Sequence, residues 1–401
     1  MPSFNQTDLL LQKSKLIRIT TVPIALAYPL NGQPSFMHNH GYEVLLVSAA
    51  GKELDLVKKQ EECPHTVVPM TRKITPLKDL KALYLLIRLF RKEKPAIVHT
   101  ETPKAGLLGM IAAWFCRVPI RIHTVAGLPL MVAHGLTLKI LQAVEMITYA
   151  AATQVWPNSN SLKEYIIKHR FCSPGKLTVI GQGSSNGIDT LRFHPDAIAN
   201  DQLNEIKDKI QYNPQACYLL FVGRLVKDKG IVELVTAFKA LKKQIPGLKL
   251  MLVGQYEEEL DPIPEDIYHE ILHNRDILHV SWTDKVEYYM ALANYFVFPT
   301  YREGFPNVLL EAAAMQLPIL CSRIGGNTDI VTENTGSLFA VKDTGAVKEA
   351  IQHALQQADE MKQKARTLHA MVIEKYKREV FWQHMLQEYN KLVKENKRLH
   401  N

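Results

Sequence analysis

Short apolar runs alternate with helical stretches along the whole chain, and this order predicts parallel β-sheets covered by helices. In the first half, the expected strands are 17–21, 43–48, 96–99, 121–124, 154–157 and 177–180. The expected helices between them are 77–94, 104–115, 136–150 and 161–169. One doubly wound α/β sheet accounts for this half.

The alternation stops at residues 181–195, GQGSSNGIDTLRFHP, whose Gly, Ser and Asn are typical of a linker or hinge. It then starts again, with expected strands at 218–222, 249–253, 278–281, 295–299, 319–322 and 337–340. The expected helices are 231–244, 285–294, 308–315 and 344–357, and long helices follow from about residue 360. We therefore expect two domains, 1–190 and 191–379, which fits a chain of 401 residues.

Two open sheets that face each other form a cleft, and ligands of such sheets bind at the carboxyl ends of the strands. The chemistry is therefore expected in loops that directly follow strands.

The net charge of +8 favours an anionic ligand: a nucleic acid, an anionic membrane surface or a nucleotide. Nucleic-acid binding is not expected, because no reading motif is present and the positive charge is interspersed with acids. The five cysteines are odd in number and form no C-x-x-C pair, which indicates a reducing compartment. The first residues lack a signal core, and the longest apolar run, 107–116, is too short to span a bilayer. We expect a cytoplasmic protein, with peripheral contact to the cytoplasmic face of the inner membrane left open.

The segment REGFPNVLLEAAAM at 302–315 carries the strongest candidate chemistry. Pro306 suits the first turn of a helix, so a helix is expected to begin near 306–308. Its first amides, 305–309, would face the cleft and bind anions or hydroxyls. Glu311 lies one turn in and leans back toward them, while Glu303 lies just before the helix. Either glutamate alone is better explained as a helix-dipole partner or a solvated acid, but together they favour a site for sugar and ribose hydroxyls.

The segment FVGRLVKDKG at 221–230 is the second candidate. A strand ends at Gly223, a helix starts near Gly230, and Arg224 and Lys229 lie in the loop between them. Glycine permits close backbone approach, and two cations there can neutralise a diphosphate. The alternative is a solvated basic turn.

GRLVKDKG, followed about eighty residues later by the E-x7-E of EGFPNVLLE, resembles the family-four retaining glycosyltransferases with the GT-B fold. The similarity extends through LMLVG (250–254), WTDKVEYYMALANYFVFPT (282–300), PILCSRIGGNTDIV (318–331), HTETPKAGLLG (99–109) and SSNGID (184–189). The resemblance implies two Rossmann-like domains facing a central cleft, the first for the acceptor and the second for the nucleotide sugar. It also implies that a C-terminal helix, about 380–401, packs back on the first domain.

By this resemblance Arg224 and Lys229 bind the donor diphosphate, Glu311 holds the ribose hydroxyls and Glu303 contacts the donor sugar. The base is expected near Val253 and the segment 281–283. The other implied donor-binding residues are Gly223, Gly254, Ser281, Trp282, Thr283, Gly304, Phe305, Pro306, Asn307, Val308 and Leu309. No D-x-D triplet or metal-ligand spacing is present, so no metal or other cofactor is expected, and the two cations would stabilise the leaving diphosphate.

One departure concerns the segment RIHTVAGLPL at 121–130. Many relatives have a histidine directly before the glycine that corresponds to Gly127, where this chain has Ala126. His123, three residues earlier, is a candidate catalytic residue that contacts the donor sugar. The alternative is a hydrogen-bonded histidine in the wall of the sheet.

The predicted helix from Leu77 to Lys94 is amphipathic. Lys78, Lys81, Arg88 and Lys92 lie on one side, with Leu80, Leu83, Ile87 and Phe90 on the other. A basic amphipathic helix can lie on an anionic membrane, whereas the alternative is a sheet-covering helix with a solvated face.

The resemblance implies retaining transfer of a hexosyl or N-acetylhexosaminyl group from a nucleotide sugar, UDP-linked, to a saccharide acceptor. A polyprenyl-diphosphate-linked acceptor in bacterial polysaccharide synthesis is expected, entering near residues 20–32, with the domains closing on the hinge. A UDP-sugar epimerase of similar fold is one alternative; it needs acid and base groups at the sugar C2, and the order of the two segments disfavours it. A non-catalytic nucleotide-sugar-binding protein is another, and Ala126 is the one feature in its favour.

Overall fold

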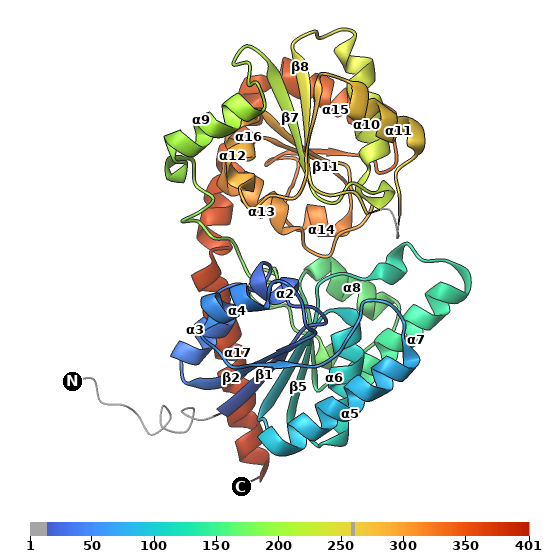
Figure 1. Cartoon of the computed structure of the whole chain (residues 1–401), viewed down its shortest axis with the longest axis vertical. Helices are drawn as coiled ribbons and strands as arrows, with labels where there is room; N and C mark the ends of the chain where they lie inside the picture. The colour runs from blue at the N-terminus through green and yellow to red at the C-terminus, as the bar shows by residue number, and fades with distance from the viewer. Residues whose placement is uncertain (1–13, 258–260, 401) are drawn as a thin grey trace, which may run out of the picture. The chain divides into compact units, whose positions relative to one another are not determined.

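The structure, a computed structural model, describes residues 14–257 and 261–400 (Figure 1). Its described residues divide into two units, 14–187 together with 379–400, and 188–378. The predicted limits, 190 and 379, lie three residues and one residue from these divisions. No helix in the described residues is long and apolar enough to cross a membrane.

The first unit contains a parallel sheet with the strand order β3-β2-β1-β4-β5-β6. Its strands are β1 (Ser14–Ile19), β2 (Tyr42–Ser48), β3 (His65–Val67), β4 (Ile97–Glu101), β5 (Ile120–Val125) and β6 (Gln154–Pro157). Its helices are α2 (Ile24–Ala27), α3 (Gln33–Asn39), α4 (Leu54–Glu61), α5 (Pro76–Glu93), α6 (Pro103–Phe115), α7 (Gly135–Ala151), α8 (Asn160–Lys168) and most of α17 (Arg378–His400). The order of the strands reverses between β1 and β4, so the loops after these two strands are neighbours.

The strand predicted at 177–180 is wrong. Leu177 makes one isolated bridge to Val155, directly after a 3₁₀ turn at Pro174–Lys176. Leu177 and Ile180 are buried apolar residues outside any strand. A short apolar run in the sequence does not distinguish such buried positions from a paired strand. Strand β3 and helices α2 to α4 were not predicted, because they are short or lack a clear period.

The predicted apolar side of the helix at 77–94 is wrong in part. In α5 the buried positions are Ala82, Leu86 and Phe90, whereas Leu80 is 65% exposed. The inward face is thus centred on every fourth residue from Ala82, and Leu80 lies on the outward side with Lys81.

Helix α17 packs on the first sheet, which confirms the prediction for the C-terminal helix. Phe381, Met385 and Tyr389 share one core with strands β1, β2, β4 and β5. Tyr389 stacks on Trp156 with 5.5 Å between the ring centroids, and its hydroxyl lies 2.5 Å from Nδ1 of His99. The buried Arg18 guanidinium donates to that hydroxyl as well, at 3.3 Å. A polar network therefore lies inside this core.

The second unit repeats the architecture with the strand order β12-β11-β10-β7-β8-β9. Its strands are β7 (Cys217–Val222), β8 (Leu248–Val253), β9 (Ile277–Val280), β10 (Tyr295–Phe298), β11 (Ile319–Ser322) and β12 (Ser337–Phe339). Its helices are α9 (Asn200–Lys209), α10 (Ile231–Lys242), α11 (Glu265–His273), α12 (Val286–Leu292), α13 (Asn307–Ala314), α14 (Gly325–Thr328), α15 (Thr344–Gln356) and α16 (Ala358–Lys375). The strands predicted for this half are confirmed, whereas α9, α11 and α14 were not predicted.

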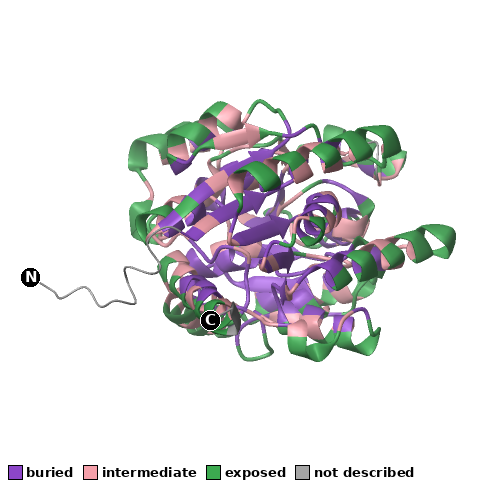
Figure 2. Cartoon of the chain, turned by 90° about the horizontal axis from the view of Figure 1, so that it is seen from below, coloured by how far each residue is buried: buried purple, intermediate pink, exposed green. Residues whose placement is uncertain are grey.

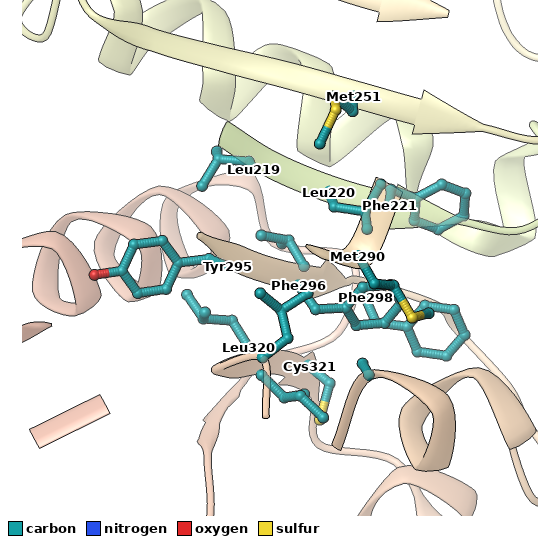
Figure 3. Close-up of a cluster of buried hydrophobic side chains, with 14 of the residues drawn as sticks. Leu219, Leu220, Phe221, Met251, Met290, Tyr295, Phe296, Phe298, Leu320 and Cys321 are labelled. Atoms are coloured by element: carbon teal, nitrogen blue, oxygen red, sulfur yellow. The ribbon is translucent and has the colours of Figure 1, made fainter. Parts of the chain in front are cut away.

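Most residues of the central strands are buried, and the helices expose their outer faces (Figure 2). In the second unit, side chains such as Leu220, Phe296 and Leu320 from three neighbouring strands fill the core (Figure 3). These near-continuous apolar strands are typical of a parallel sheet covered on both faces, which leaves the loops at its edges for polar chemistry.

Tyr389→Phe should lower the free energy of unfolding by about 1–2 kcal/mol, because His99 and Arg18 lose a buried partner. Urea unfolding measures the change. Lys391→Ala, an exposed position on the same helix, is the control and should change stability by less than about 0.5 kcal/mol. Equal stability of Tyr389→Phe and wild type would contradict a structural role for the hydroxyl.

Candidate functional site

The two candidate segments follow the strands at which the second sheet reverses its order. The chain runs from β7 to β8 and β9 on one side and then returns to β10, which pairs with β7 on the other. Such a switch point in a parallel sheet is where ligands bind. Helix α13 begins at Asn307 after Pro306, as predicted, so both segments lie at the same edge.

Lys229 and Glu303 meet in an ion pair, although 73 residues lie between them in the sequence. Both side chains are only about 15% exposed. Thr300 Oγ1 donates to the same Glu303 oxygen at 3.0 Å. A second ion pair between the same loops, Arg302 with Asp228 at 2.8 Å, lies nearby. The loops after β7 and β10 are thus joined by two pairs of opposite charges.

Arg224 forms an ion pair with Glu257, which follows β8, and its side chain is 48% exposed. The structure therefore places Arg224 at the β8 side of the loop and Lys229 at the β10 side. A diphosphate that contacts both cations would have to lie across the carboxyl end of β7.

Two glycines let the ends of β7 and β8 come into backbone contact. Gly254 has φ +149°, and a Cβ atom there would lie 1.9 Å from the carbonyl oxygen of Gly223. Gly223 donates to the Val253 carbonyl at 2.9 Å, which fixes the close approach. The close backbone approach expected at Gly223 is therefore seen against β8.

The segment after β9 contains the predicted residues Ser281, Trp282 and Thr283. Trp282 is 50% exposed, and Thr283 Oγ1 accepts the Lys285 amide at 3.1 Å. His279, which was not predicted, lies 2.9 Å from the Gly254 carbonyl through Nε2. This histidine connects the end of β9 with that of β8, and a lone histidine in a strand carried no signal for that contact.

Glu311 lies among charges that were not predicted. Burial raises the pKa of its carboxyl to about 7, while the cations Arg192 and Arg378 act in the opposite direction. Glu287, which accepts from Arg192 at 2.6 Å, adds negative charge nearby. Arg192 belongs to the hinge and Arg378 to the start of α17, so no local pattern linked them to Glu311.

The start of α13 offers fewer amides than expected. Pro306 has no N–H group, and the Leu309 amide donates to the Pro306 carbonyl at 3.0 Å. A ligand can therefore reach at most the amides of Phe305, Asn307 and Val308. Phe305 and Gly304 are buried, and Phe305 packs against Tyr376 with 5.6 Å between ring centroids.

Helix α14, which follows β11, packs against this segment, a contact that was not predicted. A Cβ atom on Gly326 would lie 2.7 Å from the Gly304 carbonyl oxygen and 2.8 Å from that of Glu303. Asn327, the next residue, donates to the Ser322 carbonyl at 2.9 Å. Among the described residues, no group of three or more His, Cys, Asp or Glu side chains could hold a metal ion.

His123 lies inside the first unit and is 3% exposed. Its Nδ1 lies 2.9 Å from Thr100 Oγ1, and burial lowers its pKa to about 4. A Cβ atom on Gly106 would lie 2.4 Å from the imidazole, so helix α6 covers the ring. This position favours the alternative role, a neutral histidine in the wall of the sheet, over contact with a sugar.

The two halves of the chain match two family models. Residues 203–368 match the model "Glycosyl transferases group 1", and residues 36–183 match "Glycosyl transferase 4-like domain".

Relatives that match most of the chain agree with these models. The chain is 36% identical to the capsular polysaccharide biosynthesis glycosyltransferase CapM of Staphylococcus aureus, over 96% of this chain and 99% of that protein. It is 30% identical to the UDP-Gal:α-D-GlcNAc-diphosphoundecaprenol α-1,3-galactosyltransferase of Escherichia coli, over 69% of this chain and 70% of that protein.

The fold is similar to the crystal structure of Anabaena Alr3699/HepE in complex with UDP and glucose. The TM-score is 0.77 at 15% identity, over 94% of this chain and all of that chain. The tandem Rossmann-like units are thus those of a GT-B fold.

Gly254→Ala should destabilise the second unit by about 2 kcal/mol or more, because the new methyl group collides with the Gly223 carbonyl. Gly247→Ala is a matched control, since the nearest atom to its new Cβ lies 3.8 Å away. Urea unfolding of both variants measures the difference. Equal stability of the two would contradict close contact between the ends of β7 and β8.

Proposed function

The chain belongs to the group 1 glycosyltransferases, and we propose that it transfers a hexosyl or N-acetylhexosaminyl group, with retention of configuration, from a UDP-sugar to a saccharide carried on polyprenyl diphosphate. The observation that carries this proposal is the Lys229–Glu303 pair at the switch point of the second sheet. The activities named for the two relatives, capsular polysaccharide synthesis and galactosyl transfer to a diphosphoundecaprenol-linked sugar, support a role in bacterial surface-polysaccharide synthesis, such as capsule or O-antigen.

In this proposal the donor diphosphate lies across the end of β7 between Arg224 and Lys229. A diphosphate carries more negative charge than one carboxylate, so it can compete with Glu303 for Lys229. Glu303 is then free to accept hydrogen bonds from the donor sugar. The two cations stabilise the charge that develops on the leaving nucleoside diphosphate, and no metal or other cofactor is needed for this step.

The acceptor hydroxyl attacks the anomeric carbon on the face from which the diphosphate leaves, and its proton passes to an oxygen of the departing diphosphate, so that configuration is retained. We expect no covalent intermediate.

The acceptor is proposed to bind the first unit near residues 20–32, after β1. Thr21 and Thr102, after β1 and β4, hydrogen-bond at the switch point of that sheet with 2.7 Å between their hydroxyl oxygens. Thr102 adopts φ +77°, a backbone conformation that residues other than glycine rarely adopt. Such strain is often retained at functional sites, which supports this location.

The proposed site of action is the cytoplasmic face of the inner membrane, where a polyprenyl-diphosphate acceptor would be embedded. Contact with that membrane through α5, the helix predicted from Leu77 to Lys94, is part of the proposal.

Arg224→Ala, Lys229→Ala and Glu303→Gln should each lower the transfer rate by about 10²-fold or more, because each removes charge that the transition state requires. Transfer from a panel of radiolabelled UDP-sugars to a synthetic polyprenyl-diphosphate saccharide measures the effect. Lys239→Ala, an exposed cation on α10, should retain the wild-type rate. Near-wild-type rates in all three folded variants would reject the assignment.

Incubation with the donor alone separates the alternatives. A transferase requires the acceptor for turnover, an epimerase converts the donor without it, and a binding protein converts nothing in either case.

Donor affinity should fall as the pH decreases through about 7. The pKa of Glu311 is raised to about 7, so the carboxyl gains a proton below that pH and no longer accepts two ribose hydrogen bonds. Calorimetry with a UDP-sugar should show roughly tenfold weaker binding at about pH 6 than at about pH 8. Glu311→Gln should bind weakly at both values, and an equally steep pH dependence in that variant would contradict this role of Glu311.

A further inference from the structure

Helix α7 of the first unit turns apolar residues outward. Leu136, Ile140, Ala143 and Ile147 are exposed at spacings of three and four residues, which places them on one outer face. Leu136 is 74% exposed, and Met146 beside the stripe is 50% exposed. The polar Glu145 and Thr148 are buried on the inner side. Leu138, Leu141 and Tyr149 pack into the core, so α7 is apolar on its outer side as well as its inner side, unlike the usual helix on a protein surface in water.

Helices α5 and α6 extend the same surface. Helix α6 packs between α5 and α7, and all three cover the same side of the sheet, where they share one core. The outer side of α5 exposes Leu77, Leu80 and Tyr84, and the end of α6 exposes Trp114 and Phe115. Of the nineteen large hydrophobic side chains exposed in the described residues, thirteen lie between Val67 and Ile147. We call the outer side of α5, α6 and α7, with the loops before α5 and α7, the apolar face.

The segment that contains α5, α6 and α7 also carries an excess of positive charge. Residues 70–151 contain twelve Lys and Arg against four Asp and Glu, an excess equal to the net charge of the whole chain, +8. Two of the four acids form ion pairs, Asp79 with Lys104 at 2.8 Å and Glu93 with Lys15 at 2.7 Å. The others, Glu101 and Glu145, are buried. The exposed charge beside the apolar side chains is therefore almost entirely basic, including Lys78, Lys81 and Arg88 on α5 and Lys139 on α7.

We propose that the apolar face docks on an anionic lipid bilayer, with the outer side chains of α7 entering the interface and the basic side chains contacting the headgroups. An anionic surface with an apolar interior satisfies both properties of this face. A second copy of the chain would bring two basic surfaces together, which costs free energy. A nucleic acid would match the charge and leave the apolar side chains in water.

The inference rests on the proposed function only in its explanation of why the protein would bind a membrane: an acceptor with a polyprenyl chain stays in the bilayer. It moves the centre of the membrane contact from the basic side of α5, predicted from the sequence, to α7.

Vesicle flotation with the full chain, without donor or acceptor, tests the proposal. Vesicles of phosphatidylcholine with phosphatidylglycerol should bind the protein, and vesicles of phosphatidylcholine alone should bind it much more weakly. The double variant Leu136→Ser with Ile147→Ser should bind the anionic vesicles at least about tenfold more weakly, because two exposed apolar side chains are lost from the contact. The control, Leu272→Ser with Val341→Ser, removes two exposed apolar side chains from the second unit and should bind as wild type does.

Lys78→Gln with Lys81→Gln tests the charge. Binding to the anionic vesicles should weaken about fivefold for each residue at low salt, and by less at high salt. Because all substituted side chains are exposed, each variant should keep the wild-type thermal unfolding temperature, which near-ultraviolet circular dichroism can monitor.

Wild-type binding by the Leu136→Ser, Ile147→Ser variant would overturn the proposal. The proposal would also be overturned if the wild-type protein were a dimer in analytical ultracentrifugation, the variant were a monomer, and neither protein bound vesicles. Transfer to a water-soluble short-chain acceptor analogue separates this result from the proposed function. Intact transfer without vesicle binding rejects the apolar face alone, and vesicle binding without transfer rejects the reaction alone.

Discussion

The ion pair between Lys229 and Glu303 is the contact on which the arrangement of the candidate site depends. It joins the loops after β7 and β10, the two strands at which the second sheet reverses its order. Removing one partner leaves the other charge largely buried, and an uncompensated buried charge costs several kcal/mol. The pair thus holds the loops together without a ligand. In the proposed function, the donor diphosphate replaces Glu303 as the partner of Lys229, so donor binding and release of the glutamate are coupled.

The sequence was informative about this site because its parts are local. Pro306 marks the start of α13, and Gly223 and Gly230 bracket the loop with Lys229, so each segment could be placed at a strand end. Contacts between distant segments left no such pattern. Arg192 and Arg378, which act on Glu311, come from the hinge and from the start of the last helix. The closure of Gly326 onto the backbone of Gly304 likewise depends on a backbone path that no residue type reveals.

Contacts between distant segments also escaped prediction in the first unit. Arg18 looks out of place in an apolar strand, yet it is buried and donates to Gln33 at 2.7 Å, to Glu101 at 3.2 Å and to Tyr389. The last of these partners lies 371 residues away in the chain, so the sequence could predict that α17 packs back but not what it contacts. A buried network of this kind stabilises one position of a helix more specifically than apolar contacts alone, since every donor needs its own partner.

Helix α7 shows why hydrophobic periodicity could not predict which side of a helix is exposed. Its sequence, GLTLKILQAVEMITYAA, is apolar on nearly all sides, so hydrophobic spacing could not indicate which side faces the sheet. The prediction for a membrane contact consequently rested on α5, whose Leu80 was placed on the wrong side.

Net charge gave no location for a membrane contact either, because acids and bases alternate in the sequence. Once the acids of residues 70–151 are found paired or buried, the same composition becomes a basic surface around an apolar helix. Neither the exposed leucines nor the exposed lysines alone would select a partner. Their occurrence on one face does, because water tolerates the lysines but not the leucines, and an anionic bilayer accommodates both.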